Sequence, residues 1–232
     1  MCCLRMTVNH SNFNTYYNYM KDLSNYRKSY EKSQLIEAEI PDTPMELFTK
    51  WFHEIENSGG ESEPNAMTVS TIGIDGFPKS RVVLLKQFSN EGFTFFTNYK
   101  SEKGLAIAKK PNVCLSFFWH SAERQVIIKG VAEKVSDEVS DQYFASRPEG
   151  SKLGAIVSKQ STVVSSRAEL EQQLAELEVQ YLGKSIERPK HWGGYQVKPV
   201  EMEFWQGRAN RLHDRIRYMK KKEIWERDRL AP

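Results

Sequence analysis

The stretch AMTVSTIGIDGFPKSRVVLLKQFSNEGFTFFTN, residues 66–98, decides the fold. Residues 67–74, 80–86 and 93–98 have the period and the β-branched or aromatic content of strands. The Asp75-Gly76 pair matches a tight hairpin turn, and Asn90-Glu91-Gly92 separates the second strand from the third. The stretch therefore predicts the start of an antiparallel β-meander.

Strand patterns continue beyond the meander, at residues 113–119, 125–135, 194–206, 212–219 and 223–230. Helical patterns are fewer and fall at residues 102–109, 137–147, 151–158 and 166–182. Because a regular alternation of strand and helix is missing, the chain favours an antiparallel β-barrel with surrounding helices over a Rossmann sheet. The predicted class is mainly β with α (α+β).

One more helix precedes the meander. Thr43-Pro44-Met45-Glu46 is a capping box with proline at the first helical position, and Ser58-Gly59-Gly60 ends the apolar periodicity that follows. The segment before this helix is polar and lacks apolar periodicity. We therefore expect residues 1–42 to form a flexible tail or lid, and residues 43–232 to form the folded domain.

The composition excludes several classes of protein. With 33 Lys and Arg against 30 Asp and Glu, the net charge of +3 is too small to imply a nucleic-acid or membrane partner. Cys2, Cys3 and Cys114 are odd in number and lack metal-ligand spacing, so we expect a reducing compartment and no metal site. No apolar run reaches the roughly 20 residues that span a bilayer, and no signal segment is evident. A cytoplasmic protein is the expectation.

Anion binding must then come from local clusters of cations. Arg81 and Lys86 lie at the two ends of an apolar strand. Their odd spacing places them on opposite faces unless a bulge intervenes, so they could serve two different anions or remain solvated strand-end charges. A second cluster, Phe96-Thr97-Asn98-Tyr99 with Ser101 and Lys103, lies at a strand-to-helix junction. Helix-start N–H groups favour phosphate there, although these residue types also serve as simple caps.

Two further clusters lie in the second half of the chain. Tyr143, Arg147 and Ser151 recur at steps of four across the Pro148 break, which makes either a phosphate cradle or a solvated helix face. Three arginines and a histidine gather after Trp205, where either a binding loop or a surface charge run fits: Arg208, Arg211, His213 and Arg215. The residues alone thus predict a barrel with several phosphate-sized cationic clusters, and their spacing reveals no flavin.

At these clusters the sequence resembles the pyridoxine/pyridoxamine 5′-phosphate oxidase family, over about residues 27–232. The matching segments are residues 81–86, 96–98, 124–126, 143–148, 158–161, 192–195, 203–207, 211–215 and 229–232. The resemblance implies an FMN-binding split barrel that forms a homodimer through C-terminal dimerisation strands, with the flavin sites at the subunit interface. It also implies oxidation of pyridoxine 5′-phosphate and pyridoxamine 5′-phosphate by dioxygen, giving pyridoxal 5′-phosphate, hydrogen peroxide and, from the amine, ammonia.

The resemblance also assigns individual residues. The implied FMN contacts are Arg81, Val82, Val83, Leu84, Phe96, Thr97, Lys103, Gln125, Gln160, Ser161, Trp205 and Arg215. The implied substrate contacts are Lys86, Tyr143, Arg147, Ser151, Arg211, Leu212 and His213, of which Arg211 and His213 are the catalytic pair that grips the pyridine ring. Arg81 and Lys103 would hold the flavin phosphate, and Lys86 and Arg147 the substrate phosphate.

Three further residues bear on this assignment. Glu102 stands where many relatives have a second basic residue, and its carboxylate would repel the flavin phosphate unless it is turned outward. Arg27 and Tyr30 have the spacing of an arginine and a tyrosine that close over the substrate in similar enzymes.

Other functions remain open at this point. Another split-barrel flavoprotein, such as a flavin reductase, would share the barrel but would not need the two substrate clusters. A module that stores FMN or pyridoxal phosphate would bind ligands without turnover. The run Lys220-Lys221-Lys222 permits a nucleic-acid reading, although a solvated turn explains it as well.

Overall fold

Every strand pairing within residues 21–232, the part of the chain that the computed structural model describes, is antiparallel. The strands are β1 (Ala66–Ile72), β2 (Pro78–Leu84), β3 (Gln87–Ser89), β4 (Gly92–Asn98), β5 (Asn112–Trp119), β6 (Arg124–Lys134), β7 (Trp192–Gln206), β8 (Asp214–Lys221) and β9 (Ile224–Leu230). They form one sheet in the order β2-β1-β5-β6-β7-β4-β3, and β8 and β9 extend it from β7. The predicted α+β class with an antiparallel sheet is confirmed.

The long strand β7 makes this arrangement possible. The first half of β7 pairs with β4 and its second half with β8, while the whole of β6 pairs with β7. The sheet curls until β2 approaches β4, yet these two strands share no ladder. One backbone hydrogen bond crosses from the end of β2, where the Lys86 N–H donates to the Thr94 carbonyl at 2.9 Å. The result is a barrel with a split between β2 and β4.

Helix α1 (Pro44–Ser58) fills the concave side of the sheet. As the capping box predicts, the Thr43 hydroxyl accepts the Glu46 N–H, and the helix ends at Gly59 in a left-handed conformation. Its buried face carries Phe48, whose ring lies 4.9 Å from that of Phe93 on β4 and 5.3 Å from that of Phe117 on β5. These aromatic contacts join α1 to the strands in the hydrophobic core.

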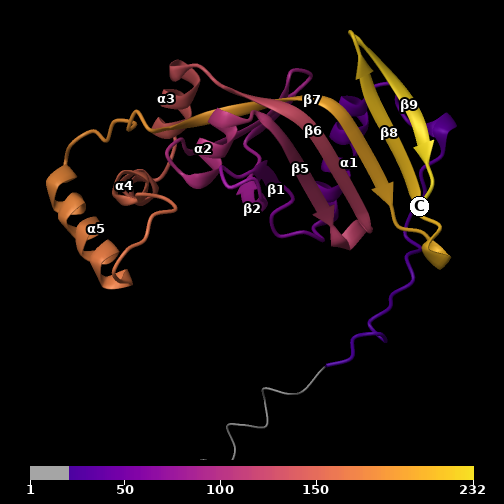
Figure 1. Ribbon diagram of the computed structural model, residues 1–232, viewed down its shortest axis with the longest axis horizontal. Helices are drawn as coiled ribbons and strands as arrows, with labels where there is room; N and C mark the ends of the chain where they lie inside the picture. The colour runs from indigo at the N-terminus through magenta and orange to yellow at the C-terminus, as the bar shows by residue number, and fades with distance from the viewer. Residues whose placement is uncertain (1–20) are drawn as a thin grey trace, which may run out of the picture.

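The remaining helices lie around one end of the molecule, opposite to β8 and β9 (Figure 1). They are α2 (Glu102–Lys109), α3 (Asp137–Ala145), α4 (Glu149–Val157) and α5 (Arg167–Tyr181), and 3-10 turns occur at η2 (Glu37–Glu39), η3 (His120–Ala122) and η4 (Ala209–Arg211). Helix α3 ends before Pro148 as predicted, because proline disfavours a helical conformation in the residue before it. No helix within residues 21–232 is long and apolar enough to cross a membrane.

The structure corrects three details of the strand predictions. The β1–β2 connection is a five-residue loop from Gly73 to Phe77, rather than a tight turn at Asp75-Gly76, because the Gly73 N–H closes it onto the Phe77 carbonyl. The short strand β3 was not predicted. The strand expected from residue 212 starts at Asp214, because Asn210 and Arg211 adopt left-handed φ angles of 57° and 61° and form a turn.

The predicted boundary between a tail and a domain stays a prediction. Residues 1–20, with Cys2 and Cys3, lie outside the described residues. Residues 21–42 are described, and several of them make hydrogen bonds to the body of the protein.

Candidate functional site

A cavity of about 660 Å³ opens in the split between β2 and β4. Strand β2 contributes Val82, Val83 and Leu84 to its wall, and Lys86 follows just beyond the strand. The other residues along it are Phe96, Thr97, Asn98, Lys103, Tyr143, Arg147, Pro148, Ser151, Gly154, Ala155, Ser158, Gln160 and Trp192. We call this space cavity 1. It brings eleven of the predicted ligand contacts together from β2, β4, helices α2 to α4 and the connections beside them.

A buried ammonium group lies in the wall of cavity 1. Lys103 is 9% exposed, and its Nζ donates to Thr97 Oγ1 at 3.2 Å and to Gln160 Oε1 at 2.9 Å. Both acceptors are neutral, and no ion pair of Lys103 occurs within the part of the chain that the structure describes. Burial lowers the pKa of Lys103, the positive charge of Arg81 lowers it further, and Glu102 opposes both. A buried ammonium group without a carboxylate partner is suited to bind an anionic ligand.

Arg81 and Glu102 lie beside this ammonium rather than along cavity 1. Arg81 Nη1 donates to Thr71 Oγ1 at 2.7 Å, and Arg81, unlike Lys86, does not line cavity 1. The Glu102 carboxylate pairs with Lys79 at 2.5 Å and lines a different cavity. The carboxylate is therefore turned away from the space where a phosphate would meet Lys103.

Aromatic rings and a second cation form the opposite wall. The Phe96 ring stacks on Tyr143 at 3.9 Å and lies nearly parallel to Trp192 at 5.6 Å. Gly194 permits this, because a Cβ there would lie 2.8 Å from the Phe96 ring. The Arg147 guanidinium lies 4.7 Å from the Trp192 ring, and its buried Nη1 has no hydrogen-bond partner among the described residues. This unsatisfied donor on a second cation also suits an anion.

Arg211 and His213 line another cavity, of about 720 Å³, which we call cavity 2. Its other residues come from the loop after β7 and from the N-terminal segment: Tyr26, Arg27, Lys28, Ser29, Tyr30, Arg208 and Asn210. Tyr30 stands edge-on to Trp205 at 5.7 Å, and its ring centroid lies 6.0 Å from that of His213. The pair Arg27 and Tyr30, expected at the substrate from their spacing, thus lies beside the predicted catalytic pair.

Local contacts orient the His213 ring. The Arg208 N–H donates to His213 Nδ1 at 3.1 Å, so the neutral ring carries its proton on Nε2. The ring also packs against Trp205 at 4.6 Å. Burial lowers the pKa of His213 and the Arg211 charge adds to this, while Asp214 opposes both. The imidazole is therefore neutral near pH 7, with Nε2–H available as a donor.

Three more predicted flavin contacts form a row across neighbouring strands. Gln125 on β6 pairs with Trp205 on β7, which pairs with Arg215 on β8. Arg215 makes a two-pronged salt bridge to Glu203 at 2.8 and 3.1 Å. This row lies outside cavity 1 and next to cavity 2.

Comparison with known proteins places this chain in a family. Residues 58–181 match the profile described as pyridoxamine 5′-phosphate oxidase, and residues 192–232 match that of the pyridoxine 5′-phosphate oxidase C-terminal dimerisation region. A protein of Flavobacterium psychrophilum named pyridoxine/pyridoxamine 5′-phosphate oxidase is 66% identical over 92% of this chain and 100% of its own length. The chain belongs to the pyridoxine/pyridoxamine 5′-phosphate oxidase family. A namesake from Thermosynechococcus vestitus is 47% identical over 92% of this chain and 100% of its own.

Solved structures agree with the fold expected of this oxidase family. PhzG of Burkholderia lata 383, in complex with tetrahydrophenazine-1-carboxylic acid, superposes with a TM-score of 0.79 at 28% identity, covering 85% of this chain and 98% of its own. An FMN-binding protein of Nostoc punctiforme related to pyridoxamine 5′-phosphate oxidase gives a TM-score of 0.64 at 13% identity, over 83% of this chain and 100% of its own. The second likeness bears on the fold alone. The predicted split barrel is confirmed.

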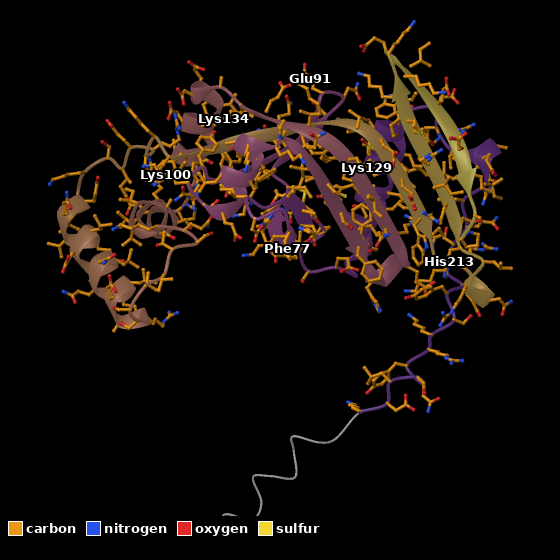
Figure 2. The ribbon with its side chains drawn as sticks, in the orientation of Figure 1. Phe77, Glu91, Lys100, Lys129, Lys134 and His213 are labelled. Carbon is orange, nitrogen blue, oxygen red and sulfur yellow. The ribbon has the colours of Figure 1, made fainter. Side chains whose placement is uncertain are left out.

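The structure divides the predicted oxidase site into two parts. Cavity 1 holds one set of predicted contacts beside α3 and α4, whereas His213 lies at the far end of the molecule (Figures 1 and 2). Besides Arg81 and the row of Gln125, Trp205 and Arg215, two more predicted contacts line neither cavity: Leu212 is 69% exposed, and Ser161 borders the same cavity as Glu102. A single chain therefore does not bring the two parts together.

Sequence reasoning placed Asn98 in the strand-to-helix cluster but gave Trp192 no role in the site. Trp192 pairs with Asn98 in the β4–β7 ladder, and its ring lies against both Tyr143 and Arg147. The Trp192-Gly193-Gly194 run was the available signal, because two glycines beside a tryptophan in a strand indicate close approach by neighbouring side chains. No group of three or more His, Cys, Asp or Glu residues suited to a metal occurs within residues 21–232, where the thiol of Cys114 is free.

Proposed function

We propose that this chain is an FMN-dependent oxidase of pyridoxine 5′-phosphate and pyridoxamine 5′-phosphate. The alcohol and dioxygen would give pyridoxal 5′-phosphate and hydrogen peroxide, and the amine, dioxygen and water would give the same products with ammonia. The observation that carries the proposal is a pair of cations in one cavity, the buried Lys103 and the half-buried Arg147, whose donors meet no carboxylate among the described residues. Two phosphorylated ligands would supply the missing anions.

The residues present fit FMN. A flavin phosphate would bind at Lys103, where Thr97 and Gln160 already share hydrogen bonds with the ammonium and Arg81 adds positive potential. The apolar side chains Val82 and Leu84 on β2 face the same space and suit a ring system. When bound, FMN would accept the hydride from the 4′ carbon of the substrate and deliver the electrons to dioxygen.

The substrate phosphate is assigned to Lys86, Tyr143, Arg147 and Ser151. These four donors line cavity 1 from α3, α4 and two connections, and the break at Pro148 separates the two helices between Tyr143 and Ser151. Arg211 and His213 would grip the pyridine ring. With its proton on Nε2, neutral His213 would donate to the 3-oxygen of the substrate, which orients the ring. Orientation is the main protein contribution that a hydride transfer needs.

We further propose that the working site is composite and forms in a homodimer. Cavity 1 of one protomer would face cavity 2 of its partner, together with the row of Gln125, Trp205 and Arg215. Two observations support this: the two parts lie apart in one chain, and the matched dimerisation region covers β7 to β9, which carry cavity 2. Val82 and Phe118 leave 69% and 51% of their surfaces exposed, as expected of side chains that await a partner surface.

A cytoplasmic location belongs to the same proposal, and the odd number of cysteines supports it. The Lys220-Lys221-Lys222 run gives little support for a nucleic-acid partner, because Lys220 and Lys221 form ion pairs with Glu223 and Glu226 along the β8–β9 hairpin.

The test is direct. The purified protein should be yellow, should release FMN rather than FAD on denaturation, and should consume oxygen and form peroxide on addition of pyridoxine 5′-phosphate. A flavin-loaded protein that oxidises neither phosphorylated vitamer would contradict the proposal, and a chain that binds no flavin at all would remove its basis.

A further inference from the structure

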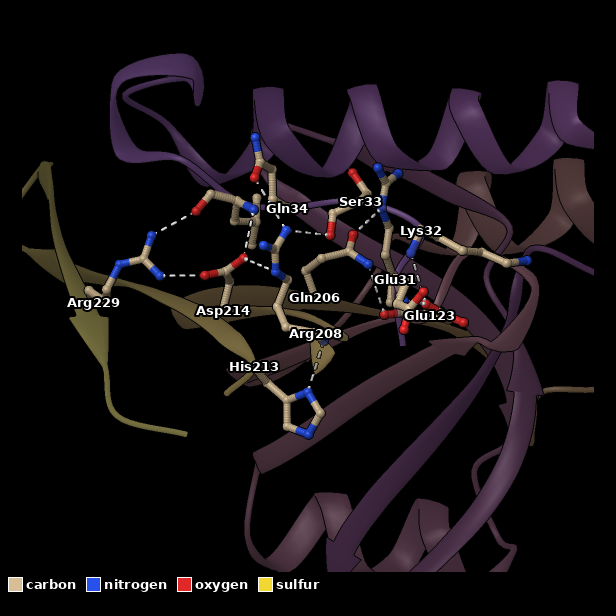
Figure 3. A network of polar contacts seen from close by, with 12 residues as sticks. Glu31, Lys32, Ser33, Gln34, Glu123, Gln206, Arg208, His213, Asp214 and Arg229 are labelled. Atoms are coloured by element: carbon tan, nitrogen blue, oxygen red, sulfur yellow. Dashed lines mark hydrogen bonds and ion pairs between the residues drawn. The ribbon is translucent and has the colours of Figure 1, made fainter. Parts of the chain in front are cut away.

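A buried carboxylate lies where the N-terminal segment meets the sheet. Glu123, between η3 and β6, is only 2% exposed and adopts a left-handed φ of 57° (Figure 3). Burying a carboxylate and holding a non-glycine residue in this conformation both cost stability. Glu123 therefore needs strong contacts that compensate for both losses of stability.

Those contacts come from one short segment, residues 28–37, which we call the N-terminal arm. Glu123 Oε2 accepts the N–H groups of Glu31 at 2.9 Å and Lys32 at 3.2 Å, and Oε1 lies 3.4 Å from Lys28 Nζ. Burial raises the pKa of Glu123, but the two N–H groups and Lys28 outweigh it, and the net pKa is lowered. The carboxylate is thus held ionised by the arm.

The main chain of the same residue holds the start of the loop after β7. The Glu123 carbonyl accepts the Gly207 N–H at 2.8 Å and Gln206 Nε2 at 3.2 Å. This loop leads to Arg208, whose N–H orients His213. Glu123 therefore holds the arm with its side chain and the wall of cavity 2 with its backbone.

The contacts of Glu123 hold Tyr30, a residue of the N-terminal arm, at cavity 2. Tyr30 precedes the two amides that Glu123 holds, and its ring covers Gly207, where a Cβ would lie 2.7 Å from the ring atoms. From there it contacts Trp205 and His213 and lines cavity 2 with Arg27. Displacement of residues 31 and 32 would carry Tyr30 away from this position.

A second attachment lies further along the arm. Asp214 Oδ2 accepts the Leu35 N–H at 3.1 Å, and Arg208 Nη1 donates to the Ser33 carbonyl at 3.1 Å (Figure 3). The residues from Ser33 onward therefore keep their own contacts with the sheet. Loss of Glu123 removes the acceptor of the Glu31 and Lys32 N–H groups and should loosen residues 28–32, although Lys32 Nζ keeps its bond to the Ser121 carbonyl, and the rest should stay attached.

We propose that Glu123 is a positioning residue for substrate binding, which fixes Tyr30 over cavity 2 without touching the substrate. This inference rests on the proposed function, because it takes cavity 2 to be the part of the site that receives the pyridine ring. A role in binding, rather than in hydride transfer, predicts that KM rises while kcat stays nearly unchanged.

The experiment compares the FMN-loaded wild type with Glu123→Gln, which keeps the volume and removes the charge. Glu123→Gly is the second variant, because glycine accepts the left-handed φ without strain. Glu133→Gln is the matched control: Glu133 lies on β6 and pairs with exposed Lys198 at 2.6 Å, far along the strand from the arm. Amide exchange of residues 28–37 and steady-state kinetics with pyridoxine 5′-phosphate are measured for each.

In both Glu123 variants, amide exchange should accelerate relative to the wild type, and more at residues 28–32 than at residues 33–37. KM should rise by roughly tenfold, the equivalent of one charge-assisted hydrogen bond. In a Tyr30→Ala background the same change should add little, because Glu123 acts through Tyr30. Additive effects, or exchange and KM equal to those of the Glu133→Gln control, would overturn the proposal. A wild-type chain that does not oxidise pyridoxine 5′-phosphate would instead overturn the proposed function and, with it, the substrate role of Glu123.

Discussion

Replacement of Lys103 by methionine should not destabilise the apoprotein but should weaken flavin binding. Methionine keeps the length of the side chain and removes the charge. In the apoprotein the ammonium is 9% exposed and meets only the neutral oxygens of Thr97 and Gln160, so its loss should leave the melting temperature unchanged or raise it. With FMN, the variant loses a charge-assisted contact to the phosphate.

The magnitude follows from that contact. A hydrogen bond to a charged group contributes about 1.5–3 kcal/mol, so FMN should bind roughly 10- to 150-fold more weakly. The apoprotein effect also has a pH signature. Because burial, followed by Arg81, lowers the pKa of Lys103, the charged form is penalised in the fold, and this penalty disappears as the pH rises towards the ordinary 10.5. The difference in stability between wild type and variant should shrink over that range.

The assay is flavin-fluorescence titration beside thermal melts of the apoprotein at increasing pH. Lys109→Met is the control, because Lys109 is an exposed residue at the end of the same helix α2. An Lys103→Met variant that melts lower as apoprotein and binds FMN as tightly as the control would show that the ammonium serves the fold and would refute the assignment.

Three further predictions concern the other charges of the site. Lys86→Ala and Arg147→Ala should each raise the KM for pyridoxine 5′-phosphate roughly tenfold or more but leave turnover of unphosphorylated pyridoxine almost unaffected, and loss of flavin from either variant would count against them. Glu102→Gln should change FMN affinity little in a fluorescence titration, because the carboxylate is paired with Lys79. Since burial and Arg211 lower the pKa of His213, protonation should lower kcat/KM only on the acid side of 6.5, and an NMR titration of the ring above that value would be inconsistent with this.

The strands and helices were largely predictable because each has a strong local signal. The Thr43 capping box, the Pro148 break and the two-residue period of β5 and β6 act within a few residues of chain. The five-residue loop after β1 and the late start of β8 were not predictable, since they depend on a backbone closure at Gly73 and on left-handed φ angles at Asn210 and Arg211.

The chemistry of the site was predictable only in part. Spacing correctly indicated that Tyr143, Arg147 and Ser151 share a wall across a helix break. It gave no sign that Lys103 would be buried without a carboxylate, or that Glu123 would hold residues 31 and 32, because both depend on contacts between distant segments. The assignment of FMN came from the family resemblance, because phosphate-sized clusters do not distinguish one phosphorylated ligand from another.

The central claim is that cavity 1 of one protomer works with cavity 2 of its partner, and subunit complementation tests it most directly. Arg147→Ala lies in cavity 1 and Arg211→Ala in cavity 2, so each variant alone should be a poor oxidase. In a hybrid dimer, one site would carry both defects and the other neither. Equal amounts of the two, dissociated and reassembled, should therefore regain roughly a quarter of the wild-type rate with pyridoxine 5′-phosphate. Reassembled mixtures that contain hybrid dimers but stay at the mean rate of the two parents would contradict the composite site.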